Sequence, residues 1–260
     1  MISIITITWN NLNGLKKTAK SVQAQTCRDF EWIIIDGGSD DGTKDYLPTL
    51  SATALSEPDR GIYDAMNKGI ERAQGDYLLF LNAGDELADP QVLQHLYNDL
   101  HKENFPDFVY GPALEGRNNH DPVTKSARGI KFLFWGMPTH HQAMLYKRET
   151  LGKIRYNLSY KIAADYELTC RFLKNAKTVH MTQYPICLFE PGGISQQAVK
   201  QGRTEQFDIR QNAMEPADLY TAGGSYGTSS SPAGFVLVRT REAALQKIKL
   251  HRTKIWLRFC

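Results

Sequence analysis

A turn that is rich in side-chain oxygen follows the apolar run at residues 77–81. It reads Asn82-Ala83-Gly84-Asp85. Such a turn suits a hard divalent cation such as Mn²⁺ or Mg²⁺, because these ions prefer carboxylate, carbonyl and phosphate oxygens. The same four residues also fit an ordinary turn before a helix, in which Asp85 would have no chemical role. The local pattern leaves both interpretations open.

A second candidate carboxylate is Asp165, near the start of a helix that we expect at 163–173. A carboxylate at that place can cap the helix and do nothing more. Held near a hydroxyl group, it can also act as a general base. Glu167 lies two residues further and points elsewhere on the helix, so we expect it on the surface.

The segment 56–69 offers charges that suit a phosphate group. Asp59 precedes Gly61 and could cap the helix that follows, whereas Arg60 and Lys68 could face a diphosphate. Guanidinium and ammonium groups both pair with phosphate oxygens. The alternative is a solvated helix start.

Other catalytic patterns are missing from the sequence. It has no G-x-G-x-x-G or P-loop glycine pattern after the first strand and no H-E-x-x-H. His140 and His141 directly precede the expected strand 142–147. Adjacent residues in extended backbone point in different directions, so a shared metal is not expected there. The chemistry must therefore come from carboxylates.

The elements that would position these carboxylates alternate between strand and helix. The expected strands are 2–8, 32–35, 77–81, 108–110, 142–147 and 183–189, and the expected helices are 12–22, 41–50, 62–74, 91–100, 163–173 and 196–212. This alternation predicts an α/β fold with a doubly wound, mostly parallel sheet and helices on both faces. Ligands of such sheets bind at the carboxyl ends of the strands, where Asp36 and the turn at 82–85 both lie.

Composition limits the class of protein. The chain has 260 residues, a net charge of +3, 42% hydrophobic and 23% charged residues, which is typical of a globular protein with one large domain. No basic patch with interleaved aromatics precedes the C-terminus, so no nucleic acid is expected. No apolar run reaches the roughly 20 residues that span a bilayer, and no secretory signal is apparent. We therefore expect a cytoplasmic protein.

The C-terminal region differs in composition. We expect a catalytic domain over residues 1–214, a mobile Gly- and Ser-rich linker over 215–234, and a basic amphipathic helix over 235–260. Such a helix can lie on an anionic membrane surface, which would place the protein on the inner face of the cell membrane. It can equally pack its apolar side on the catalytic domain.

Four sequence blocks, found in this order and spacing, together form a pattern that is highly specific for one protein family. They are residues 3–10, 35–43, 57–69 and 75–85. His141-Gln142-Ala143 and residues 189–195 fit the same pattern, so that the match covers about residues 1–195. The chain resembles the inverting glycosyltransferases of family 2, which have the GT-A fold. Within that family it is most similar to the enzymes of colanic acid and exopolysaccharide biosynthesis.

The resemblance implies an activity. The enzyme would move a sugar from a UDP- or GDP-linked donor to a polysaccharide or lipid-linked oligosaccharide with inversion, using Mn²⁺ or Mg²⁺. The nucleotide-sugar half would be about 1–110 and the acceptor half about 111–214.

The resemblance also implies site residues. Asp165 would be the general base, Asp85 the metal ligand, and His141 and Gln142 would meet the acceptor. Trp9 would stack on the base and Asp36 would contact the nucleoside. The full donor-binding set is Thr8, Trp9, Asn10, Asp36, Asp59, Arg60, Asn67 and Asn82.

Three positions depart from the family pattern. Gly37 stands where many relatives carry an acid that reads uracil, so a guanine donor is plausible. Gly84 replaces an inner acid of the metal motif, and Ala164 replaces the Glu before the base.

Two rival functions stay open: a sugar-1-phosphate nucleotidyltransferase, whose usual Gly-x-Gly-Thr-Arg loop is missing here, and an inactive sugar-nucleotide-binding scaffold.

Overall fold

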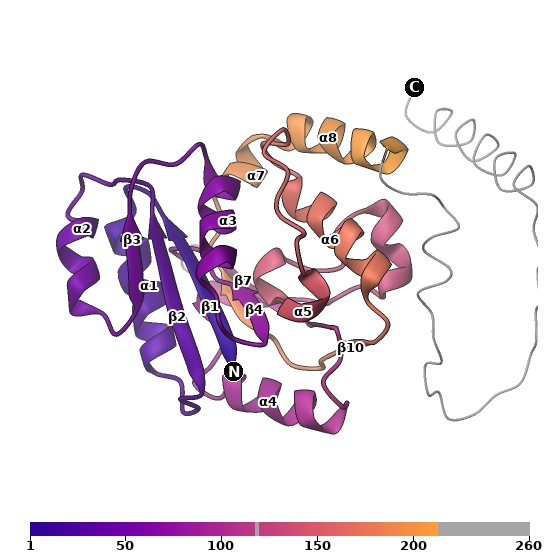
Figure 1. The fold of residues 1–260 in the computed structure, drawn as a ribbon, viewed down its shortest axis with the longest axis horizontal. Coiled ribbons are helices and arrows are strands. Elements are labelled where there is room, and N and C mark those ends of the chain that lie inside the picture. The colour runs from indigo at the N-terminus through magenta and orange to yellow at the C-terminus, as the bar shows by residue number, and fades with distance from the viewer. Residues whose placement is uncertain (118–119, 213–260) are drawn as a thin grey trace, which may run out of the picture. The chain divides into compact units, whose positions relative to one another are not determined.

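The computed structural model describes residues 1–117 and 120–212 (Figure 1). In this part of the chain, the larger sheet has the strand order β10-β6-β9-β4-β1-β2-β3. Its strands are β1 (Ile2–Thr8), β2 (Phe30–Asp36), β3 (Thr53–Ser56), β4 (Tyr77–Phe80), β6 (Phe108–Tyr110), β9 (Met144–Lys147) and β10 (Val179–Met181).

β1 is an interior strand of the sheet and consists mainly of β-branched residues, all of which are buried. It pairs in parallel with β2, from Ile2 opposite Phe30 to Thr8 opposite Asp36, and in parallel with β4. β9 runs antiparallel to both of its neighbours, β4 and β6. The predicted mostly parallel sheet is confirmed, with β9 as its antiparallel insertion.

Helices cover both faces of this sheet, because alternate side chains of a strand point to opposite faces. Ile5 and Ile7 pack in a core with α3 and α6, whereas Ile2 and Ile4 pack in a second core with α1 and α4. The helices are α1 (Leu12–Gln23), α3 (Ile62–Arg72), α4 (Val92–Lys102), α6 (Ala164–Asn175) and α8 (Val199–Asn212), with short α2 (Thr43–Tyr46), α5 (Arg148–Leu151) and α7 (Ile194–Gln197).

A smaller sheet, which the sequence did not predict, has the order β5-β11-β7-β8. Its strands are β5 (Glu86–Leu87), β7 (Ala113–Arg117), β8 (His120–Lys125) and β11 (Cys187–Phe189). β11 pairs antiparallel with β5, with Leu188 opposite Glu86. This pairing brings the residues after Phe189 next to the turn at 82–85.

Several predicted boundaries differ from the structure. The helix expected over 41–50 is α2 followed by a 3-10 turn at Leu47–Thr49, and the one expected over 196–212 is divided into α7 and α8. The strand expected over 142–147 begins only at Met144, after a 3-10 turn at His141–Ala143.

α3 ends at Arg72, before Gly75. The N–H of Gly75 instead bonds to Ser3 Oγ at 2.9 Å and to the Glu31 carboxylate at 2.8 Å, which fixes the entry to β4.

The linker and basic helix expected over 215–234 and 235–260 lie outside the described residues. Along the part of the chain that is described, no helix has the length and apolar character needed to cross a membrane.

Candidate active site

The carboxyl ends of β1 and β2 lie side by side and carry the expected nucleoside site. Trp9 follows β1 directly and is 69% exposed, so its ring is free to stack on a base. Asn10 has a positive φ of 47° and joins the two loops. Its N–H donates to Ser39 Oγ at 2.7 Å, and its Oδ1 accepts from the Asp40 N–H at 2.9 Å. Thr8 is buried, and its Oγ1 has no hydrogen-bond partner among the described residues.

Asp36 is fully buried at the end of β2. Its carboxylate accepts the N–H of Ser39 at 3.1 Å, the Ser39 hydroxyl, and the Ser56 hydroxyl at 2.6 Å. These bonds fix the loop beside Trp9.

The side chain of Asp59 occupies the space into which a side chain at residue 37 would point. A Cβ at Gly37 would lie 3.0 Å from Asp59 Oδ2 and 3.3 Å from the Trp9 ring. Lys68 Nζ pairs with Asp59 at 2.6 Å and with Glu57 at 2.9 Å. Lys68 is thus already neutralised by acids, unlike the free cation that we expected to face a diphosphate.

Two further donor candidates are engaged within the protein. Arg60 is mostly exposed and pairs with Asp64 at 2.8 Å, which holds it at the start of α3. Asn67 Nδ2 donates to the Tyr156 carbonyl at 3.0 Å, and its Oδ1 accepts the Tyr156 N–H at 2.8 Å. Asn67 therefore ties α3 to the segment that precedes α6.

The turn after β4 presents Asn82 and Asp85. Asp85 is 4% exposed and accepts two hydrogen bonds, from Gln142 Nε2 at 2.8 Å and from the Glu190 N–H at 2.9 Å. Burial raises the pKa of Asp85 to about 7, although both hydrogen bonds act in the opposite direction. Asn82 Oδ1 is buried without a hydrogen-bond partner among the described residues.

The residues expected to meet the acceptor line the same pocket as the two carboxylates. Gln142 bonds to Asp85 as above, and His141 is stacked on Phe80 with ring centroids 4.8 Å apart. His141 Nε2 hydrogen-bonds the Tyr156 hydroxyl at 2.8 Å. Burial lowers the pKa of His141 to about 3, so its ring is neutral.

Asp165 lies in the first turn of α6, two residues after the N-cap position at Ala163. Its Oδ1 accepts the N–H of Tyr166 at 2.8 Å. Burial raises its pKa to about 6, whereas hydrogen bonds from that N–H and from Tyr63 act in the opposite direction. This value suits a base that works near neutral pH.

The backbone of residues 161–163, which leads into α6 and Asp165, is held by an acid that the sequence analysis did not single out. Glu205 of α8 accepts the N–H groups of Lys161, Ile162 and Ala163 at 3.0, 2.8 and 2.9 Å.

Glu167 was expected on the surface, and that prediction was wrong. It is 7% exposed and pairs through both oxygens with Arg171. The sequence did contain a signal for this ion pair, because an acid and a base four residues apart lie on the same face of a helix.

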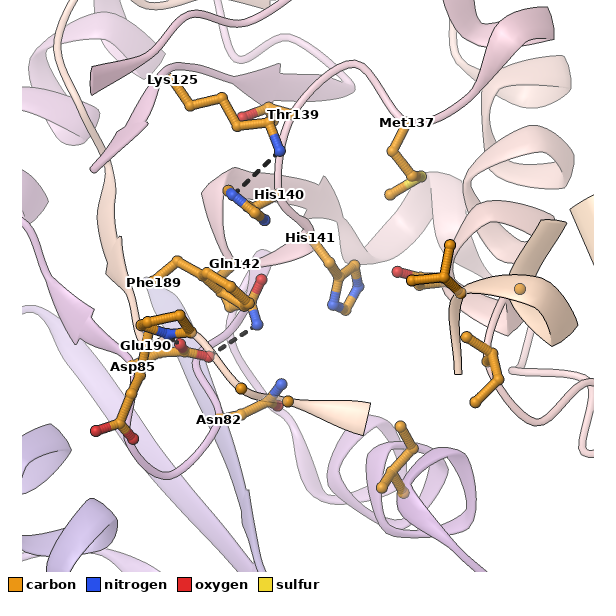
Figure 2. Close-up of a pocket in the computed structure, with 18 of the residues that line it drawn as sticks. Asn82, Asp85, Lys125, Met137, Thr139, His140, His141, Gln142, Phe189 and Glu190 are labelled. Carbon is orange, nitrogen blue, oxygen red and sulfur yellow. Dashed lines mark hydrogen bonds between the residues drawn. The ribbon is translucent and has the colours of Figure 1, made fainter. Parts of the chain in front are cut away.

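One pocket of about 750 Å³ collects the expected metal, base and acceptor residues. Figure 2 shows Asp85 joined to Gln142 on one side, with Asn82 and Glu190 nearby and His141 facing the space. Its wall includes Asn82, Asp85, His141, Gln142, Asp165 and Glu190. The nucleoside candidates Trp9 and Asp36 lie outside this wall, at the neighbouring strand ends.

A divalent cation fits the residues at the turn. Within residues 1–117 and 120–212, no three acidic, histidine or cysteine side chains form a metal site by themselves. Magnesium-type sites of nucleotide enzymes, however, use one or two carboxylates completed by phosphate and water. Asp85, with the unpartnered Oδ1 of Asn82 beside it, supplies such a partial set.

Comparison with known proteins identifies the family of the chain. The sequence model of Glycosyl transferase family 2 matches residues 3–168. A PGL/p-HBAD biosynthesis glycosyltransferase of Mycobacterium bovis is 33% identical over 204 residues, 75% of this chain and 79% of the relative.

Solved structures share the fold. S. aureus TarS residues 1–349 superposes with a TM-score of 0.64 at 16% identity, covering 85% of this chain and 69% of that one. The mannosyltransferase PcManGT of Pyrobaculum calidifontis also gives 0.64 at 16% identity, covering 85% and 67%. From the matched family and this shared GT-A architecture, the chain belongs to glycosyl transferase family 2 and is a glycosyltransferase.

Proposed function

We propose that the protein transfers a sugar from a nucleoside diphosphate sugar to a hydroxyl group of a saccharide acceptor, with inversion at the anomeric carbon. One observation carries the proposal: Asp85 and Asp165 line the same pocket of about 750 Å³. The first carboxylate serves the diphosphate of the donor, and the second serves the attacking hydroxyl. His141 and Gln142, which line the same pocket, contact the acceptor.

Asp165 acts as the general base. It accepts the proton of the acceptor hydroxyl while that oxygen bonds to the anomeric carbon, and the bond from this carbon to the phosphate oxygen breaks. The nucleoside diphosphate leaves with the bonding electron pair. With a pKa of about 6, Asp165 is mostly ionised at pH 7 and remains basic enough to take the proton.

Asp85 and Asn82 would hold a Mn²⁺ or Mg²⁺ ion for the donor diphosphate. A bound cation neutralises the charge that develops on the leaving group. The solved structure of PcManGT contains GDP-Man and Mn²⁺, which supports a divalent cation in this fold. Gln142 keeps the Asp85 carboxylate in place through its hydrogen bond of 2.8 Å.

Trp9 stacks on the base, and Thr8, Asn10 and Asp36 shape its site. The Asp59 carboxylate lies where a side chain at residue 37 would point, beside the Trp9 ring. Guanine presents adjacent N1–H and N2–H donors to such a carboxylate, whereas uracil presents a single N3–H. An acid in this place can also read uracil, as the resemblance implies for the residue missing at Gly37, so the donor is UDP- or GDP-linked. The two adjacent donors of guanine are our reason to favour GDP.

Arg60 and Asn67 complete the donor side at α3. Arg60 is exposed and able to turn toward phosphate. Asn67 acts by holding α3 against Tyr156.

The acceptor is a polysaccharide or a lipid-linked oligosaccharide, as in colanic acid or other exopolysaccharide synthesis. The M. bovis relative is named for the biosynthesis of PGL/p-HBAD. A basic C-terminal segment would hold the enzyme at an anionic membrane surface, where a lipid-linked acceptor is found.

Product analysis tests this function. The protein is incubated with Mn²⁺, a series of UDP- and GDP-sugars, and oligosaccharide acceptors. Release of a nucleoside diphosphate together with a product of inverted anomeric configuration is the expected result. Release of pyrophosphate would instead indicate a nucleotidyltransferase, and donor binding without turnover would indicate a scaffold.

A further inference from the structure

Position 84 does not accommodate an acid. Gly84 has a φ of +107°, a conformation that L side chains rarely adopt. The turn after β4 therefore offers a single carboxylate, that of Asp85, to a cation. Two carboxylates would neutralise a divalent charge better than one.

A carboxylate from a distant part of the chain fills this gap. A Cβ at Gly84 would overlap Oε2 of Glu190 and would lie 3.2 Å from its Cδ. Glu190 follows β11, and the pairing of Leu188 with Glu86 carries it to the turn. The Glu190 N–H also donates to Asp85 Oδ1 at 2.9 Å. Strand pairing thus places an acid beside Asp85 in the space that a side chain at residue 84 would occupy.

The Glu190 carboxylate is accessible to a ligand. Its side chain is 38% exposed and lines the pocket together with Asp85 and Asn82. Oε1 pairs with Lys17 Nζ of α1. Oε2, the oxygen over Gly84, has no hydrogen-bond partner within the described part of the chain. The buried Asn82 Oδ1 beside this turn likewise has none.

We propose that Glu190 is the second carboxylate ligand of the divalent cation at the donor diphosphate, in place of an acid at position 84. The proposal rests on the metal-dependent function proposed above and adds a residue to it. Lys17 holds Glu190 in position without the cation. Because a carboxylate shared with an ammonium group is a weaker ligand, the cation and Lys17 compete for Glu190.

Manganese binding to the full-length protein tests this role without relying on turnover. Free Mn²⁺ is measured by electron paramagnetic resonance during titration, with GDP or UDP present. The variants are Glu190→Gln, Lys17→Met and the double variant. Asp85→Ala is the positive comparison, and Glu71→Gln, at an exposed glutamate of α3, is the matched control. Circular dichroism checks that each variant folds.

We expect Glu190→Gln to weaken Mn²⁺ binding about tenfold or more, since even the loss of an outer partner of a metal ligand costs ~10–100-fold. Lys17→Met should strengthen binding several-fold, and this gain should vanish in the double variant. Glu71→Gln should bind as the unmodified protein does.

Two results would overturn the proposal. If Glu190→Gln binds Mn²⁺ normally while Asp85→Ala does not, Glu190 only forms an ion pair with Lys17, and the metal-dependent function stands. If the unmodified protein binds no Mn²⁺ with either nucleotide, this proposal and the metal-dependent function fail together.

Discussion

Gln142 Nε2 donates to Asp85 Oδ2 at 2.8 Å, and so joins the residue expected to meet the acceptor to the residue expected to hold the metal. Both side chains are more than nine-tenths buried. We therefore expect a change at Gln142 to alter the position or charge of the Asp85 carboxylate.

Replacing this amide with a carboxylate tests the relationship. In Gln142→Glu, two acids would face each other at hydrogen-bond distance, which costs on the order of 1–3 kcal/mol without a cation. For a domain of this size the melting temperature would fall by roughly 2–4 °C for each kcal/mol. Mn²⁺ should bridge the two acids, so that it raises the melting temperature more than in the unmodified protein.

The chain offers a matched control for this change. Gln201 Nε2 donates to Glu205 Oε1 at 2.9 Å, a contact of the same type on α8, although Gln201 is exposed whereas Gln142 is buried. Gln201→Glu should lower the melting temperature without recovery by Mn²⁺. Equal recovery in both variants, measured by calorimetry, would contradict a cation at Asp85.

Asp165→Asn should retain the fold and donor binding but lose about 10²–10⁴-fold in transfer rate, because the amide accepts no proton. In the unmodified enzyme, kcat should rise with pH through about 6 and level off above it, since the base works only when ionised. Initial rates from pH 5 to 8 measure this profile. Asp45→Asn, an exposed aspartate on α2, serves as the control. A near-normal rate in Asp165→Asn would remove it as the base.

The sequence predicted those parts of the site that depend on local order. The β-branched run of β1 and the apolar run of β4 end in polar residues, so the positions of Trp9 and Asp85 at strand ends followed from pattern alone. The direction of β9 did not follow, because a short buried run reads the same in a parallel and an antiparallel strand.

The contacts of Glu190 and Asp59 depend on long-range pairing. Glu190 reaches Gly84 only because β11 pairs with β5, about a hundred residues away in sequence. Asp59 similarly fills the space at Gly37 from the loop after β3. A sequence shows that an acid is missing at positions 37 and 84, but not which distant side chain replaces it.

The nucleotide preference can be measured directly. We expect GDP to bind at least as tightly as UDP with Mn²⁺, because guanine offers two adjacent donors to the Asp59 carboxylate, whose Oδ2 lies toward position 37 while Oδ1 pairs with Lys68. Asp59→Asn should weaken GDP binding more than UDP binding. Calorimetric titrations of both nucleotides, with Asp45→Asn as the control, give the comparison. A clear preference for UDP would refute the assignment.

The basic segment at the C-terminus makes a separate prediction from sequence. The segment contains seven basic residues and a single acidic one, Glu242. The basic residues are Arg239, Arg241, Lys247, Lys249, Arg252, Lys254 and Arg258. Apolar residues such as Leu245, Ile248 and Trp256 are interleaved with them. Each cation near an anionic leaflet contributes about 1 kcal/mol to binding, and the apolar residues add buried area.

Truncation at Ala233 tests this attachment. The described core includes Ile209 of α8 and is formed by residues before the truncation, so we expect the shortened protein to fold. The full-length protein should sediment with anionic liposomes at low salt and be released as salt screens the charges. The truncated protein should stay in solution but still bind nucleotide. Unfolding on truncation would instead indicate that the segment packs on the catalytic domain, and a full-length protein that never sediments would exclude the membrane role.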